Sequence, residues 1–233
     1  MARTRNKKIK KYNILVCAHP DDETLFFAGL VLQSRKQNWL IACVTDGNAD
    51  GMGQKRKADF EKACRLLGAQ KTEFFGLPDV YDQRLDIKRL QMCLSQLPPA
   101  QIVYTHGPVG EYGHPHHQDV CFAVHDYFQK KTKVRGVAYN CEPDFVIQLS
   151  PAEFKTKAKI LSTIYGSETQ RFQNLLPCTF AEGFTEYSMA EVSELYRFYS
   201  EKKWPDGKKL KKTKWLLPFF EIHKNNPVGP RPF

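Results

Sequence analysis

Short apolar runs and amphipathic stretches alternate along most of the chain, and this alternation predicts an α/β fold with a mostly parallel sheet covered by helices on both faces. Tyr12–Ala18 is typical of a buried first strand, and Trp39–Thr45 of a second. Between them, Asp21–Lys36 has a helical pattern with acidic residues in the first turn, where the helix dipole favours them. These runs already predict a β-α-β unit.

The same alternation continues to about residue 165. The further elements that it predicts are, in order, Gln54–Leu67, Lys71–Phe75, Arg84–Leu97, Ala100–Tyr104, His116–Phe128, Arg135–Asn140, Phe145–Leu149 and Pro151–Tyr165. The first of these helices is expected to end at Gly68, a typical C-cap residue. After Gly166 the pattern weakens, and we expect short helices and a tail rich in Pro and Lys, packed on the same domain.

Composition narrows the class of protein. The chain has 233 residues, of which 42% are hydrophobic, so it can bury a core without disulfides. No apolar run approaches the roughly 18 residues of a membrane span, and the basic start lacks the apolar segment of a secretory signal. The seven cysteines are scattered and form no CxxC motif. We therefore expect a soluble protein of the reducing cytoplasm; a homo-oligomer is compatible with the sequence.

The net charge of +10 is concentrated in two segments. Residues 1–12 and residues 202–214 each carry +6, which leaves −2 for the rest of the chain. We interpret 1–11 as a solvated basic tail, 12–233 as one domain, and 202–214 as a solvated loop. Peripheral contact of these segments with phosphate, an acidic glycan or a membrane surface is the alternative. Nucleic-acid binding is not expected, because the body of the chain is close to neutral.

Polar residues of the kinds used in catalysis follow the predicted strands. In sheets of this type, ligands bind outside the carboxyl ends of the strands, so these segments are expected to share one site. The segments are Ala18–Glu23, Asp46–Gly53, Pro78–Arg84 and His106–His117. No G-x-G-x-x-G follows the first strand, which argues against a dinucleotide cofactor.

Two of these segments carry metal-ligand chemistry. In the first, His19 and Asp22 are three residues apart in a sharp strand-to-helix turn and could bind one cation, although acids that merely cap the helix fit equally well. In the second, four of the seven histidines lie within twelve residues. His19, Asp22 and one of these histidines would form an N/O set with an open position, as in catalytic zinc sites. A free carboxylate and a second histidine beside it predict metal-assisted hydrolysis.

Several short motifs follow one another along residues 12–175. They are AHPDDE (18–23), TDG (45–47), a helix with Arg56, Asp59, Ala63 and Leu67-Gly68, LPD (77–79), GEYGHPHH (110–117), and Tyr165, Ser167 and Gln170. In these motifs the sequence resembles the PIG-L/LmbE-type zinc-dependent de-N-acetylases, a Rossmann-like family that removes acetyl groups from N-acetylated sugars. The pairing of AHPDDE with a downstream HPxH is the specific part of this resemblance.

The resemblance implies a role for particular residues. It implies one Zn²⁺ per chain, although the same donors would accept other divalent metals. The zinc ligands would be His19, Asp22 and His117. Asp21 would be the general base that activates water, and His114 would stabilise or protonate the tetrahedral intermediate and the departing amine. Arg56 and Asp79 would bind the sugar.

Three departures from the family pattern stand out. His116 occupies a position where the family commonly has Asp, which alters the support of a catalytic histidine. Asp59 replaces the usual Glu, and residues 175–233 match nothing in the pattern.

The sequence therefore predicts hydrolysis of the N-acetyl group of a GlcNAc-type sugar to a free amine and acetate. Two alternatives remain open. One is a zinc amidase acting on a non-sugar N-acyl compound, and the other is a non-catalytic binding protein that uses the two basic segments.

Overall fold

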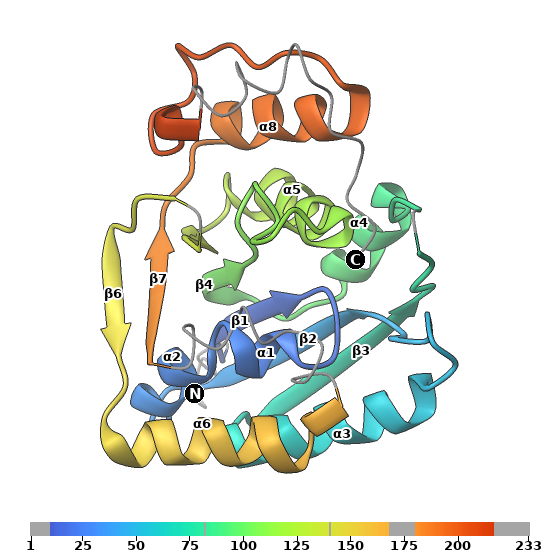
Figure 1. Cartoon of the computed structure of the whole chain (residues 1–233), viewed down its shortest axis with the longest axis vertical. Coiled ribbons are helices and arrows are strands. Elements are labelled where there is room, and N and C mark those ends of the chain that lie inside the picture. Colours follow the sequence, from blue (N-terminus) through green and yellow to red (C-terminus); the bar gives the residue numbers. More distant parts are fainter. Residues whose placement is uncertain (1–9, 82, 140, 168–179, 217–233) are drawn as a thin grey trace, which may run out of the picture.

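The computed structural model describes residues 10–81, 83–139, 141–167 and 180–216 (Figure 1). The strands are β1 (Tyr12–Cys17), β2 (Trp39–Thr45), β3 (Lys71–Leu77), β4 (Ala100–Thr105), β5 (Val134–Val137), β6 (Phe145–Gln148) and β7 (Ala181–Thr185). The helices are α1 (Asp22–Leu25), α2 (Ala28–Gln33), α3 (Gly53–Leu67), α4 (Ile87–Ser95), α5 (Pro115–Phe128), α6 (Pro151–Thr163) and α8 (Met189–Glu201).

All seven of these strands belong to one sheet, in the order β3-β2-β1-β4-β5-β7-β6. The first five strands in this order run parallel, and β7 runs antiparallel to both of its neighbours. The predicted mostly parallel α/β fold is confirmed. The mixed end of the sheet comes from segments after residue 140, where the sequence pattern is weaker.

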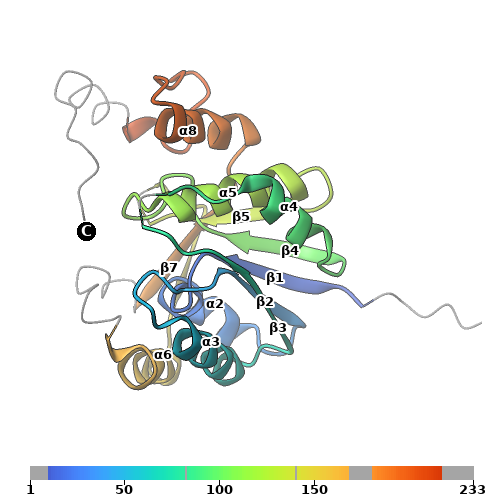
Figure 2. The ribbon, with the colours of Figure 1, turned by 90° about the vertical axis from the view of Figure 1, so that its right-hand side faces the viewer.

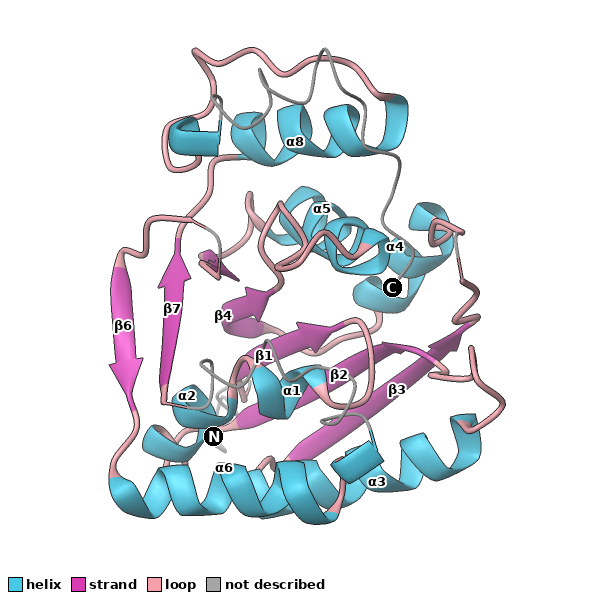
Figure 3. Cartoon of the chain, viewed as in Figure 1, coloured by secondary structure: helices cyan, strands magenta, loops and turns pink. Residues whose placement is uncertain are grey.

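Helices cover both faces of the sheet, as Figure 2 shows from the side. α4 and α5 lie on one face, and α2, α3 and α6 lie on the other. α8 packs on the outer side of α5, so this part of the molecule has an additional helical layer (Figure 3). The carboxyl ends of the parallel strands remain uncovered by these long helices, and the loops that follow them form the site described below.

The alternation of side chains along β1 explains why helices pack on both faces. Ile14 and Val16 belong to the core beneath α4 and α5, whereas Leu15 and Cys17 belong to the core beneath α2 and α3. Successive side chains of a strand point to opposite faces, so a strand buried on both sides reads as a continuous apolar run. This is why β1 and β2 were predictable almost to the residue.

The prediction of one continuous helix over 21–36 is wrong. The chain forms two short helices there, with a break at Phe26 and Phe27. Both rings are buried, and Phe27 departs from helical geometry with φ −133° and ψ 0°. The break frees the backbone N–H groups of Gly29 and Leu30, which donate to the two carboxylate oxygens of Glu182 at 2.7 and 2.9 Å. A partner far along the chain therefore starts a new helix within a locally helical sequence.

The late part of the chain is more ordered than the pattern predicted. β7 and the thirteen-residue helix α8 replace the expected short helices, while Gln170 lies outside the described residues. The helix predicted from Arg84 begins at Ile87, because the Asp86 side chain accepts a hydrogen bond from the backbone of Arg89 as its N-cap. The helix before Gly68 ends as expected, with this glycine at φ 97°.

The basic segment 202–214 is partly tied to the domain. Lys209 lies 2.8 Å from Glu194, Lys212 pairs with Asp144, and Glu191 accepts one hydrogen bond from the backbone N–H of Lys212. Most of the basic tail, residues 1–9, lies outside the described residues. Among the described helices, none combines the length and apolar character needed to cross a membrane.

Candidate metal centre and active site

The segments that follow β1, β2, β3 and β4, each a loop with the first turn of the next helix, converge at the carboxyl edge of the sheet. They bring together all seven residues to which the sequence assigned a role, and most of these side chains are buried. The residues are His19, Asp21, Asp22, Arg56, Asp79, His114 and His117. The structure thus places side chains nearly 100 residues apart in sequence within hydrogen-bonding distance of one another.

The turn between β1 and α1 is tight and strained. Asp21 has φ 117°, a conformation that residues other than glycine rarely adopt, and strain of this kind persists where the surroundings enforce it. The Asp22 carboxylate accepts a 2.8 Å hydrogen bond from the backbone N–H of His19 and so closes the turn on itself. Gly47, at φ 61°, lets the next loop approach closely, because a Cβ there would lie 3.1 Å from the Pro20 ring.

One donor atom from each of the three predicted ligands lies within 4.8 Å of the other two, so the three residues form a compact donor triangle. Nδ1 of His19 lies 3.2 Å from Nε2 of His117 and 3.4 Å from an Asp22 oxygen. The other Asp22 oxygen lies 3.5 Å from Nε2 of His117. Zinc bonds of about 2.0–2.1 Å in tetrahedral geometry separate neighbouring ligands by roughly 3.3 Å. The donor chemistry and the spacing therefore both fit a zinc ion.

Glu111 lies within the site, although the sequence predicts no role for it. Its carboxylate accepts hydrogen bonds from Nδ1 of His106, at 3.0 Å, and from Nδ1 of His117, at 2.5 Å. Burial raises the pKa of Glu111, but the two histidines outweigh it and lower the pKa to about 2. Glu111 therefore holds His117 with its Nε2 directed away from the carboxylate, toward the donor triangle. The GEYG segment contains this acid, but nothing local distinguishes it from a solvated loop residue.

The electrostatics of the cluster show a surplus of negative charge. Burial would lower the pKa of His106, yet the charges of Glu111 and Asp22 raise it to about 10. Burial would raise the pKa of Asp22, yet His117 and His106 hold it well below its usual value. The buried carboxylates thus favour the protonated form of a neighbouring imidazole. A bound cation would stabilise the same negative charge.

His114 stands at the entrance to α5 as its N-cap. Its Nδ1 accepts a 3.2 Å hydrogen bond from the backbone N–H of His116, so the neutral ring carries its proton on Nε2. Its ring lies 4.6 Å from that of His19 and stacks on His117 at 4.7 Å. Burial and the neighbouring His19 strongly lower the pKa of His114, which favours the neutral form.

Arg56 connects the predicted base to the predicted substrate-binding acid. Its guanidinium lies 3.3 Å from the Asp21 carboxylate and 3.9 Å from that of Asp79. The Asp46 side chain accepts a 3.0 Å hydrogen bond from the backbone of Asp79 and fixes this loop. Arg56 and Asp79 are thus buried beside the metal-ligand candidates, where the sequence predicted substrate contacts.

Glu23 supports the strained turn from behind. One of its oxygens accepts a 3.0 Å hydrogen bond from the backbone N–H of Asp21, and the other accepts one from the Thr24 hydroxyl at 2.5 Å. Burial raises the pKa of Glu23 to about 7. The acid that closes the AHPDDE motif therefore helps to position Asp21.

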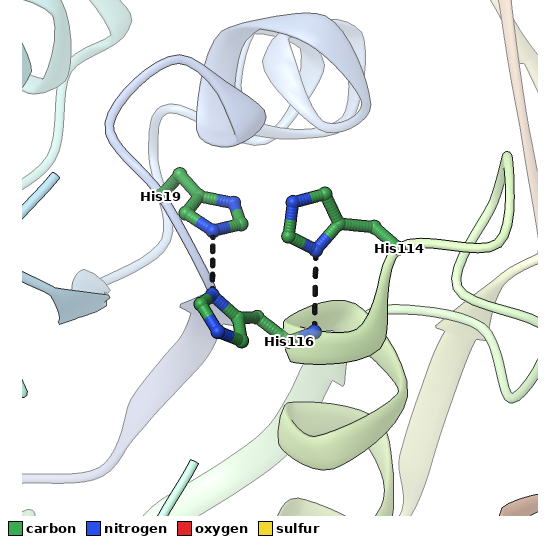
Figure 4. Close-up of side chains that lie close together, drawn as sticks. All are labelled: His19, His114 and His116. Atoms are coloured by element: carbon green, nitrogen blue, oxygen red, sulfur yellow. Dashed lines mark hydrogen bonds between the residues drawn. The ribbon is translucent and has the colours of Figure 1, made fainter. Parts of the chain in front are cut away.

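His116 points into the cluster rather than outward from α5. Its Nδ1 lies 3.1 Å from Nε2 of His19, and its Nε2 lies 2.9 Å from the backbone oxygen of Gln83 (Figure 4). It also approaches an Asp79 oxygen at 3.4 Å. This histidine therefore contacts the second nitrogen of a predicted zinc ligand.

Part of the chain is similar to known proteins. Residues 14–128 match the family profile described as PIG-L, GlcNAc-PI de-N-acetylase. An N-acetylglucosaminyl-phosphatidylinositol de-N-acetylase of Saccharomyces cerevisiae is 32% identical over 139 residues, covering 51% of this chain and 45% of that protein. The Bos taurus enzyme of the same name is 34% identical over 122 residues, covering 48% of each. The chain spans about half the length of these curated relatives.

A solved structure shares the fold. N,N'-diacetylchitobiose deacetylase from Pyrococcus horikoshii superposes with a TM-score of 0.59 at 17% identity, covering 77% of this chain and 84% of that one. The shared fold defines the class, a Rossmann-like α/β protein. Within that class, residues 14–128, which contain all seven predicted site residues, match the PIG-L family.

Proposed function

We propose that this protein is a zinc-dependent deacetylase that hydrolyses the N-acetyl group of a GlcNAc-type sugar to a free amine and acetate. The observation that carries the proposal is the donor triangle of His19, Asp22 and His117, with the Asp21 carboxylate held beside it by Arg56. The names of the curated relatives, which act on N-acetylglucosaminyl-phosphatidylinositol, support the choice of an N-acetylated amino sugar as substrate.

When bound to His19, Asp22 and His117, Zn²⁺ supplies polarisation of the acetamide carbonyl and lowers the pKa of a water to about 7. Asp21 takes the proton of the attacking water, because its carboxylate lies beside the donor triangle and is oriented by the Arg56 guanidinium. The same proton then passes from Asp21 to the departing amine nitrogen as the carbon–nitrogen bond breaks. The products are the free amine and acetate.

His114 stabilises the oxygen of the tetrahedral intermediate. Because its Nδ1 accepts the backbone hydrogen bond of His116, its Nε2–H is the donor available to the substrate. A neutral imidazole suits this role, since it donates a hydrogen bond without giving up its proton. The structure therefore favours stabilisation over the proton-donor role that the sequence left open for His114.

Asp79 and Arg56 orient the sugar. A carboxylate and a guanidinium are well suited to hydrogen-bond sugar hydroxyls, and both side chains are buried and held by further contacts. Such groups fix the ring of the substrate relative to the reacting amide.

The test is to incubate zinc-loaded protein with two substrate panels, N-acetylglucosaminides and N-acetylated amino acids, and to quantify free amine and acetate. We expect both products in equal amounts from the sugars, and none with Asp21→Asn. Turnover of the amino acids alone would replace the sugar deacetylase with a general amidase. Activity that persists unchanged in Asp21→Asn would overturn the proposed mechanism.

A further inference from the structure

The imidazole of His19 has donor atoms gathered at both of its nitrogens. On the Nδ1 side are His117 and Asp22, in the triangle already described. On the Nε2 side, Nδ1 of His116 lies at 3.1 Å and an Asp79 oxygen at 3.7 Å. The third edge of this second triangle, from His116 to Asp79, measures 3.4 Å.

The second triangle has the dimensions of a coordination site. Tetrahedral zinc with bonds of about 2.0–2.1 Å separates its ligands by roughly 3.3 Å, and the three edges of 3.1, 3.4 and 3.7 Å lie around this value. A hydrogen bond between His19 and His116 would explain the 3.1 Å edge, but not the two edges that lead to Asp79. The Asp79 oxygen faces both nitrogens at once, as a third ligand of one cation would.

Charge alone is satisfied by a single divalent ion. The carboxylates of Asp21, Asp22, Asp79 and Glu111 face the Arg56 guanidinium and the His106 imidazole, whose pKa burial lowers but Glu111 and Asp22 raise to about 10. It is the spacing of the donors around Nε2 of His19 that indicates a second cation. Arg56 approaches Asp79 at Oδ2, so the other oxygen of that carboxylate is the one turned to the histidines.

We propose that His19 Nε2, His116 Nδ1 and Asp79 Oδ1 form a second divalent-cation site, which shares the His19 ring with the first. Two imidazoles and a carboxylate select borderline cations such as Zn²⁺ and Co²⁺. His114 lies beside the site as a possible fourth donor, since His19, His114 and His116 offer ligand atoms within 4.8 Å of one another (Figure 4). The inference concerns cation binding and does not depend on the substrate of the enzyme.

Because the two sites share the His19 ring, they are expected to differ in affinity for a cation. Each cation uses the lone pair of one His19 nitrogen, so filling both sites releases the ring proton to solvent. The first site has the Glu111 carboxylate behind its His117 ligand and is expected to fill first. A cation at the second site would then occupy Asp79 and face His114, so excess Zn²⁺ should inhibit the proposed deacetylation.

The test counts cations. Metal-free full-length protein is titrated with Co²⁺, and binding is followed by equilibrium dialysis and by the visible absorption of tetrahedral Co²⁺. We expect two ions per chain in the natural protein and one in His116→Gln and in Asp79→Asn. His117→Ala should lose the first site and keep the second. His125→Gln, on the same helix but outside the cluster, should still bind two, and circular dichroism verifies that each variant is folded.

The outcomes separate the two proposals. One Co²⁺ per chain in the natural protein, or two in folded His116→Gln, would overturn the second site. Where deacetylation is measurable, excess Zn²⁺ should slow the natural protein roughly tenfold more than His116→Gln, each relative to its own rate at one equivalent. Two bound ions without any deacetylation would leave the second site standing and refute the proposed function.

Discussion

The Glu111 carboxylate lies 2.5 Å from Nδ1 of His117, on the side of the ring opposite the nitrogen that faces Asp22 and His19. This hydrogen bond assigns the His117 proton to Nδ1 and leaves the Nε2 lone pair for a cation. Glu111 also accepts from His106 and from the backbone N–H of Gly107, so its own position is fixed from three directions. The first prediction follows from this arrangement.

Replacing Glu111 by Gln should weaken zinc binding by roughly 10–100-fold, because an amide holds the His117 ring less firmly and lowers its basicity. Competition with a chromogenic chelator measures the affinity. Glu73→Gln, which changes an acid paired with Lys71 at the surface, is the matched control. Equal affinity in Glu111→Gln and in the natural protein would reduce Glu111 to a structural residue.

Replacing Asp21 by Asn should lower the deacetylation rate by roughly 10²–10⁴-fold while zinc content stays the same, because an amide can contact Arg56 but cannot take a proton. Turnover and metal content are measured on the same preparation. Asp59→Asn, which removes an acid paired with Lys55 on α3, should keep normal turnover. Loss of zinc in Asp21→Asn would instead make Asp21 part of the metal site.

Breaking a buried ion pair away from the site should strongly destabilise the fold. Lys157 and Glu182 lie 2.7 Å apart and are both buried. Lys157→Met leaves the Glu182 carboxylate without its cation and should lower the free energy of unfolding by about 3–5 kcal/mol, measured by urea denaturation. In contrast, Lys55→Met at the surface should cost less than about 1 kcal/mol.

A second substitution shows whether Lys157→Met destabilises the fold through the lost charge partner or through lost packing. The double variant Lys157→Met with Glu182→Gln removes both charges and should recover part of the stability, because no unpaired charge remains buried. A double variant as unstable as the sum of the two single variants would contradict this account.

His125 should make stability depend on pH. Burial lowers its pKa to about 4, although its Nδ1–H donates a 2.8 Å hydrogen bond to the Cys121 carbonyl. The unfolded value is 6.5, so as the pH falls the unfolded chain takes up the proton first. The stabilisation is complete above about pH 6.5 and is lost between there and about pH 4, an effect of the order of 3 kcal/mol.

The measurement is the free energy of unfolding between pH 4 and 8. His125→Leu should flatten the part of the curve between pH 6.5 and 4, because no buried imidazole then resists protonation. A curve with the same slope in His125→Leu as in the natural protein would assign the acid sensitivity to other groups, such as the histidines of the site.

The strands β1 and β2 in the parallel part of the sheet were predictable, because a strand that is buried on both faces has a continuous apolar sequence. β7 was not, because Ala181–Thr185 is short and contains Glu182 and Gly183, which are both poor strand formers. Its place in the sheet depends on pairing with β5 and β6. The division of the 21–36 helix likewise depends on the Glu182 carboxylate, which no local pattern can reveal.

The proximity of His19, Asp22 and His117 was predictable from their positions at strand ends. The sequence also indicated that several histidines would gather at one edge of the sheet. It could not tell which ring nitrogen each would present, since this depends on distant partners such as Glu111 for His117 and the His116 backbone for His114. Catalytic and ligand roles for these residues remain predictions for the experiments above.

The position of β7 between β5 and β6 affects how the sheet can form while the chain is being synthesised. Until residues 181–185 have emerged, β5 and β6 each present a row of unpaired backbone N–H and C=O groups. Such open edges recruit strands from other molecules and lead to aggregation. A nascent or truncated chain that ends before β7 therefore lacks the strand that joins β6 to the rest of the sheet, even when all of its metal-binding motifs are present.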